Sequence, residues 1–182
     1  MKEPKAVTFQ PKLLWDIGTA YDLFVSLKVI HEPTAFGLRA AWAAGMRSRL
    51  PSEERETLEQ LHRVKFCITP LHWVYKLPEP KDGAAVLKAM SALAPEERLP
   101  ALGKDPELPV EVVAVLDEVA TNEAWDDAQV EELITLSKEK EDGEGPQQET
   151  IELTLEWWSR PAEFGDRLLT ALRCQEPDRV PF

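Results

Sequence analysis

The sequence has few cysteines and no long apolar run, and these two absences exclude two classes of protein. Only two of its 182 residues are cysteine, which is too few for the disulfide framework of a small secreted protein. No apolar run approaches the roughly 18 residues of a membrane-spanning helix. The first residues also lack the apolar stretch and cleavage site of a signal peptide. We therefore expect a cytoplasmic protein that does not enter the membrane.

Recognisable catalytic, phosphate-binding and metal-binding motifs are also absent. The chain contains no GxSxG, P-loop, GxGxxG, CxxC or HExxH pattern. His62, Cys67 and His72 are spaced by five residues, which does not stack side chains on one helix face. We therefore predict no catalytic residue, no metal ion and no cofactor, and expect a protein other than an enzyme.

Positive charge is scarce in the second half of the chain. The net charge of the whole chain is −12. Residues 1–81 hold 12 basic and 9 acidic residues, whereas residues 82–182 hold 9 basic and 24 acidic residues. Such a chain repels phosphate backbones, so direct nucleic-acid binding is not expected. The acidic half is either a solvated surface or the contact for a basic partner, and the mildly basic half suits an anionic one.

Most of the apolar residues recur at helical spacing, and one short segment instead alternates apolar and polar residues. Val7 and Phe9 alternate with polar residues in segment 6–10, which predicts a short N-terminal strand. Elsewhere the pattern predicts an all-α bundle of roughly eight to ten helices in one domain of residues 1–182. A proline-rich stretch at 77–83 is a candidate subdomain junction. The expected helical segments are 16–31, 34–49, 52–66, a turn within 67–77, 83–94, 95–102, 110–120, 126–141, 148–158 and 161–173.

Six tryptophans are unusual for a chain of this length, and they suggest where a ligand or partner binds. Trp42 lies on an apolar helical stripe, so core packing is the favoured interpretation for it. Trp157 and Trp158 point about 100° apart on a helix, so we expect only one of them to face the core and the other to face a partner, a ligand cavity or the last helix. All-α bundles place ligand pockets between helices. The candidate ligand site combines aromatic residues for stacking with polar anchors: Tyr21, Trp42, Trp73, Arg39 and His72.

Several segments carry a family resemblance. Segment 21–33 reads YDLFVSLKVIHEP and segment 35–51 reads AFGLRAAWAAGMRSRLP. Together they resemble the N-terminal helical domain of a group of bacterial ArsR-type winged-helix transcription regulators. In that group a Tyr-x-Leu-x-x-Ser-Leu helix precedes a helix that contains Trp and Arg and ends in Leu-Pro. The segments PLHWVYKLPEP, APEERLPAL and EWWSRPAEFGDRLLTAL are similar to that domain as well.

The resemblance implies a regulatory or interaction domain, for effector sensing or dimerisation, that acts with a winged-helix DNA-binding domain. No basic recognition helix followed by a β-wing is visible in the sequence, and the metal-sensing cysteine pair of some ArsR proteins is missing. DNA binding and metal sensing are therefore not carried over. The implied partners are the DNA-binding domain or another protein, a small-molecule effector and a second copy of the chain.

The last residues have no closing helix. Segment 175–182 contains two prolines, and we interpret it as a natural tail or as a linker to a missing C-terminal domain. The alternative function is a stand-alone helical protein that binds a small ligand or another protein.

Overall fold

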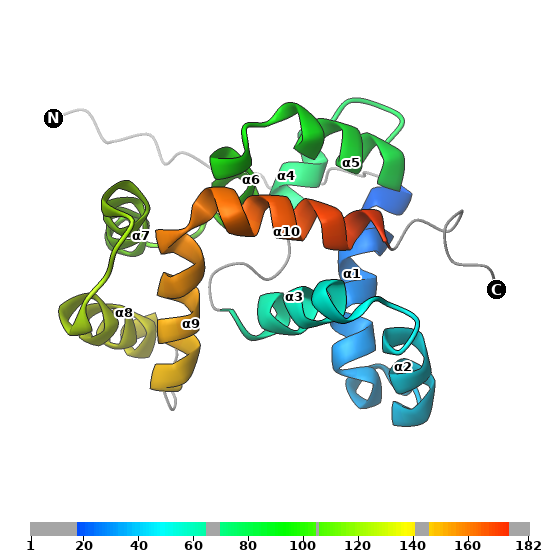
Figure 1. Ribbon diagram of the computed structural model, residues 1–182, viewed down its shortest axis with the longest axis horizontal. Helices are drawn as coiled ribbons and strands as arrows, with labels where there is room; N and C mark the ends of the chain where they lie inside the picture. The colour runs from blue at the N-terminus through cyan, green and yellow to red at the C-terminus, as the bar shows by residue number, and fades with distance from the viewer. Residues whose placement is uncertain (1–17, 65–69, 105, 141–145, 175–182) are drawn as a thin grey trace, which may run out of the picture.

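The computed structural model describes residues 18–64, 70–104, 106–140 and 146–174. This part of the chain contains ten α-helices, one 3-10 helix and no strand, which confirms the predicted all-α bundle (Figure 1). The strand predicted at 6–10 lies outside the described residues. In chain order the elements are α1 (Thr19–His31), η1 (Pro33–Phe36), α2 (Ala40–Arg47), α3 (Ser52–Arg63), α4 (Leu71–Tyr75), α5 (Gly83–Ala92), α6 (Pro95–Gly103), α7 (Val110–Asn122), α8 (Asp127–Lys140), α9 (Gln148–Ser159) and α10 (Pro161–Arg173).

Two hydrophobic cores lie toward opposite ends of α10, which crosses the centre of the molecule (Figure 1). The first core is built mainly by α7, α8 and α9, and α10 contributes Phe164 to it. The second core is built by α1, α4, α5 and α10, which contributes Leu168, Leu169 and Leu172. Leu61 of α3 packs against both cores. α10 therefore connects the two cores through successive turns of one helix.

Local capping explains several helix starts as predicted. The Asp82 carboxylate accepts a hydrogen bond from the Ala85 amide at 2.8 Å and begins α5. Asp126 and Gln129 form a reciprocal capping box before α8, because each side chain accepts from the backbone amide of the other. Pro95 and Pro161 occupy the first positions of α6 and α10, where a missing amide hydrogen costs little.

The helix predicted over 34–49 is wrong, because the chain breaks it into η1 and α2. Gly37 has a φ of +72°, which ends the 3-10 turn in the left-handed region that glycine adopts most easily. The Gly37 amide bonds the Thr34 carbonyl at 3.1 Å, and the Leu38 amide bonds the Pro33 carbonyl at 2.8 Å. Arg39 is extended, and α2 begins after it. The apolar stripe assumed for Trp42 therefore does not exist as one continuous helix.

Trp157 and Trp158 are both fully buried in the first core, which corrects the expectation that only one of them faces the core. Trp157 also faces the last helix, as one of the predicted alternatives had it, because it stacks on Phe164 of α10. α9 is contacted by α7 and α8 and also by α3 and α10. A helix surrounded in this way can bury residues whose side chains point about 100° apart. None of the described helices combines the length and hydropathy of a membrane-spanning segment.

Candidate functional site

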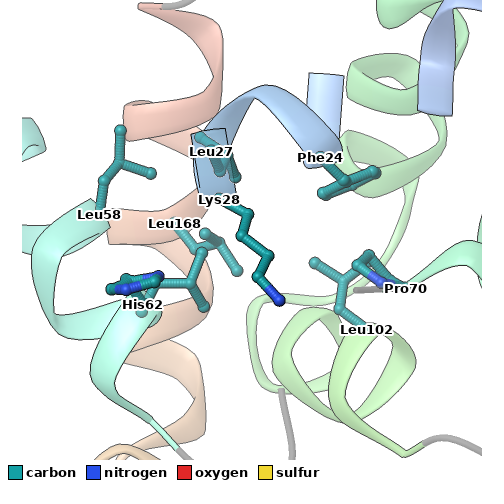
Figure 2. A pocket seen from close by; sticks show the side chains of 9 residues that line it. Phe24, Leu27, Lys28, Leu58, His62, Pro70, Leu102 and Leu168 are labelled. Atoms are coloured by element: carbon teal, nitrogen blue, oxygen red, sulfur yellow. The ribbon is translucent and has the colours of Figure 1, made fainter. Parts of the chain in front are cut away.

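A small apolar cavity lies between α1, α3, α6 and α10, beside Pro70 (Figure 2). Its volume is about 30 Å³. Since a single water needs roughly 10–15 Å³ measured in this way, the cavity has space for a very small molecule. Its lining is mostly leucine and consists of Phe24, Leu27, Lys28, Leu58, Leu61, His62, Pro70, Leu102 and Leu168.

α1 and α3 each contribute three residues of one helix face to the cavity lining. α1 supplies Phe24, Leu27 and Lys28, and α3 supplies a matching set at the same spacing of three and then one residue. Residues three and four apart lie side by side on a helix surface. In each set the last member is polar: Lys28 on α1 and His62 on α3. The remaining walls are apolar, while Lys28 is exposed and His62 is half-buried.

Lys28 carries the only charge that is certain at neutral pH among the lining residues. Figure 2 shows its side chain extending from α1 into the space between the leucines and Pro70. The lining contains no carboxylate, hydroxyl or thiol. Lys28 is exposed, so water screens its ammonium group, and its attraction for an anion is that of a surface charge. The cavity therefore suits a ligand with one acidic end and one apolar end.

The His62 imidazole is held by contacts behind the cavity. It stacks on His31 of α1 with ring centroids 4.8 Å apart and an interplanar angle of 13°. His31 is fixed in turn, because its Nδ1 donates to the Leu27 carbonyl at 2.8 Å. His62 Nε2 lies 3.4 Å from a carboxylate oxygen of Glu32. The stack therefore joins the last turn of α1 to the last turn of α3.

The pKa of His62 is lowered below its ordinary value. Burial of the ring is the largest cause, because it penalises the charged form, and the nearby His31 acts in the same direction. The Glu32 carboxylate opposes the shift, whereas the Lys28 ammonium adds to it. At neutral pH His62 is therefore uncharged and acts as a hydrogen-bonding group, and Lys28 supplies the positive charge.

The five residues predicted for the ligand site do not line this cavity. Tyr21 and Trp73 pack against the second core, and His72 lies half-buried on α4. Arg39 and Trp42 lie at the start of α2, and both are exposed. α1 has 13 residues and is therefore about 20 Å long. Tyr21 belongs to the first turn of α1, whereas α2 lies beside the other end of that helix (Figure 1).

Core packing, the favoured interpretation of Trp42, is wrong, because 46% of this residue is exposed. Within α2 only Ala43 is buried. The interruption at Gly37 turns α2 away from the cores, so that the helix packs on α1 through a small residue. Trp42 therefore lies on a surface rather than in a core.

Sequence reasoning missed Lys28 and His62 as cavity residues. The available signal was the repeated spacing of two apolar residues followed by one polar residue, 24–27–28 and 58–61–62. That spacing is typical of any helix edge, so it does not select these residues from others. Leu102 and Leu168 are far away in the chain, and only the packing of α6 and α10 brings them to the same cavity.

The three residues considered for a metal ion do not form a described site. Cys67 lies outside the described residues, and His62 stacks on His31 instead of converging with His72. Within ranges 18–64, 70–104, 106–140 and 146–174, no group of three or more His, Cys, Asp or Glu side chains could hold a metal ion. The chain matches no protein-family model, and no curated protein and no solved structure is significantly similar to it.

Proposed function

We propose that the chain is an effector-sensing regulatory domain of the kind that accompanies a winged-helix DNA-binding domain in ArsR-type regulators. The observation that supports this proposal is the exposed Lys28 side chain that lines an apolar cavity between four helices (Figure 2). We expect binding without turnover, with Lys28 and His62 as the polar contacts of the ligand. The effector is a small monocarboxylate with a short apolar tail.

The proposed ligand acts by joining the four helices that border one cavity. Its carboxylate pairs with Lys28, while its tail contacts Leu102 of α6 and Leu168 of α10. A ligand shifts a conformational equilibrium only if it binds one state more tightly. A ligand between α1, α3, α6 and α10 favours the state in which these helices are closest, and a DNA-binding domain attached to them would respond to that shift.

Thermal unfolding with a series of straight-chain carboxylates tests this proposal. We expect the melting temperature to rise in a saturable way, with an optimum at a short chain length because the cavity is small. The primary amides of the same acids lack the charge and should bind at least about tenfold more weakly, since a hydrogen bond to a charged group contributes roughly 1.5–3 kcal/mol. Equal binding of amides and acids would contradict the assignment of Lys28.

Two lysine variants make the test specific. Lys28→Met keeps most of the apolar stem and removes the ammonium, so it should abolish the preference for carboxylates over amides. Lys88→Met on the exposed face of α5 is the matched control and should leave that preference unchanged. Carboxylate binding should also raise the pKa of His62, because it places a negative charge beside the ring. An NMR titration of the His62 ring protons measures that change.

The proposed regulatory role is tested by sequencing the reading frame beyond codon 182. A following segment with a basic helix and a β-wing supports the regulatory role. A stop codon at that point contradicts it and favours the alternative, a stand-alone protein that binds a small ligand. The carboxylate titration separates this second function from a purely structural role.

A further inference from the structure

Large apolar side chains are exposed along η1 and α2, at the end of the molecule opposite to α7 (Figure 1). The exposed fraction is 45% for Phe36, 39% for Leu38 and 46% for Trp42. Gly45 lies one turn after Trp42 on the same face of α2, and no atom lies within 4 Å of the Cβ that a side chain would have there. Trp42 therefore borders open space on this face of α2.

The charge of this region is the opposite of that of the chain. Segment 33–51 contains three arginines and no acidic residue, whereas the whole chain has a net charge of −12. Arg47 is used internally, because it donates a hydrogen bond to the Ile30 carbonyl of α1. Arg39 and Arg49 are exposed. We call the residues Phe36, Leu38, Arg39, Trp42, Gly45 and Arg49 the α2 surface.

We propose that the α2 surface binds an acidic amphipathic helix of a partner protein. Trp42 and Leu38 contact the apolar face of that helix, and its backbone approaches closely at Gly45. Arg39 and Arg49 pair with its carboxylates. Tryptophan and arginine are the residues that most often dominate binding energy at interfaces, and an amphipathic helix in a shallow apolar groove is a common recognition mode.

The chemistry of the surface argues against two other occupants. A second copy bound with twofold symmetry would place the same patch against itself, so the arginines of both copies would meet without a carboxylate between them. A membrane-binding amphipathic helix has a strongly charged polar face opposite its apolar face, whereas the one charged residue of α2 is Arg47, which bonds the Ile30 carbonyl. The absence of any acid in 33–51 selects an acidic partner through charge complementarity.

A designed peptide supplies the probe. It is a fluorescein-labelled helix of about four turns, with leucine at positions that repeat every three or four residues and glutamate at most others. We expect saturable binding to the whole chain by fluorescence anisotropy, with an affinity at least tenfold lower at high salt. A peptide with lysine in place of glutamate should not bind. Equal binding of the lysine peptide, or of a shuffled peptide without an apolar face, would overturn the proposal.

Two substitutions locate the binding site. Trp42→Ala removes the apolar anchor, and Gly45→Glu fills the open face and repels an acidic helix. Each should reduce the affinity for the peptide at least tenfold. Gly45→Glu does so without loss of folding, since the new Cβ meets no atom and glutamate favours a helix more than glycine does. Tyr75→Ala on α4 removes an aromatic residue of similar exposure, 49%, and should leave the affinity unchanged. Full peptide affinity in Trp42→Ala would overturn the proposal.

The remaining outcomes assign the surface to another occupant. A concentration-dependent dimer in analytical ultracentrifugation that Trp42→Ala dissociates would identify a second copy as the occupant and overturn the proposal. Binding to phosphatidylcholine–phosphatidylserine vesicles that the same variant loses would identify a membrane and also overturn it. The α2 surface is independent of the carboxylate cavity. Lys28→Met should therefore leave peptide binding unchanged, and Trp42→Ala should leave carboxylate binding unchanged.

Discussion

Gly165 of α10 lies directly against the Pro95 carbonyl at the start of α6. A Cβ at position 165 would overlap that oxygen and would also crowd the Cβ of Arg98. The close approach lets α6 and α10 pack backbone to backbone. Arg98 crosses the same junction, because its Nε donates to the Met90 carbonyl at 3.0 Å and its Nη1 bonds the Asp166 carboxylate. The missing side chain at 165 thus sets the distance between two helices that both cores share.

Alanine substitution at two helical glycines should therefore have opposite effects. Gly165→Ala should lower the free energy of unfolding by about 1–3 kcal/mol, because backbone atoms must move to admit the methyl group. Gly45→Ala should raise it by about 0.5–1 kcal/mol, because no atom lies near the new Cβ and alanine favours a helix. Urea unfolding of both variants measures the two signs. Destabilisation by both variants would contradict the open face at Gly45.

The two buried tryptophans should differ in their response to phenylalanine. Trp157 Nε1 donates to Gln60 Oε1 at 3.3 Å, whereas Trp158 Nε1 is buried with no hydrogen-bond partner in the described part of the chain. Both substitutions remove the same volume. Trp157→Phe also removes a hydrogen bond, while Trp158→Phe removes a donor whose burial is costly.

We therefore expect Trp157→Phe to lower the free energy of unfolding more than Trp158→Phe, by about 1–2 kcal/mol. The stack of residue 157 on Phe164, with centroids 4.4 Å apart, is kept by the phenylalanine. Chemical denaturation at one pH and one salt concentration gives both values. Equal losses would indicate that a buried water satisfies the Trp158 N–H.

The lowered pKa of His62 predicts a loss of stability in acid. As the pH falls through about 6.5, the ring in the unfolded chain takes up a proton before the folded one does. The contribution of His62 to the free energy of unfolding is therefore fully present above about pH 6.5 and decreases below it. His62→Gln removes this pH dependence of the free energy of unfolding. The difference in free energy of unfolding between wild type and variant should therefore shrink as the pH decreases. A difference that grows in acid would mean that the attraction of Glu32 outweighs burial.

The capping box of α8 predicts a contrast between adjacent aspartates. The Asp126 carboxylate accepts from the Ala128 amide at 2.9 Å and from the Gln129 amide at 3.3 Å. Asp126→Ala should lower the free energy of unfolding by about 1 kcal/mol, because those donors lose their protein acceptor. Asp127 lies in the first turn of α8, where its charge interacts favourably with the helix dipole. Asp127→Ala should therefore cost about 0.5 kcal/mol or less, and equal costs would indicate that the cap contributes nothing.

The sequence predicted the helical class and many helix ends because these depend on neighbours in the chain. An Asp before α5, a capping box before α8 and a proline at the start of α6 each satisfy or spare backbone amides within one turn. Such signals can be read without knowledge of the fold. The break at Gly37 was also present locally, but the apolar residues on either side of it favoured one continuous helix.

What lies inside and what lies outside was decided only by the tertiary structure. Helical periodicity gives the direction of a side chain but not the number of helices around it. α9 is covered on several sides, so Trp157 and Trp158 are both buried, whereas α2 contacts few elements and leaves Trp42 exposed. The cavity has the same origin, because Lys28 and Leu168 are 140 positions apart in the chain and meet only where α1 and α10 pack. Helix formation is a property of a segment, but burial is a property of the whole assembly of helices.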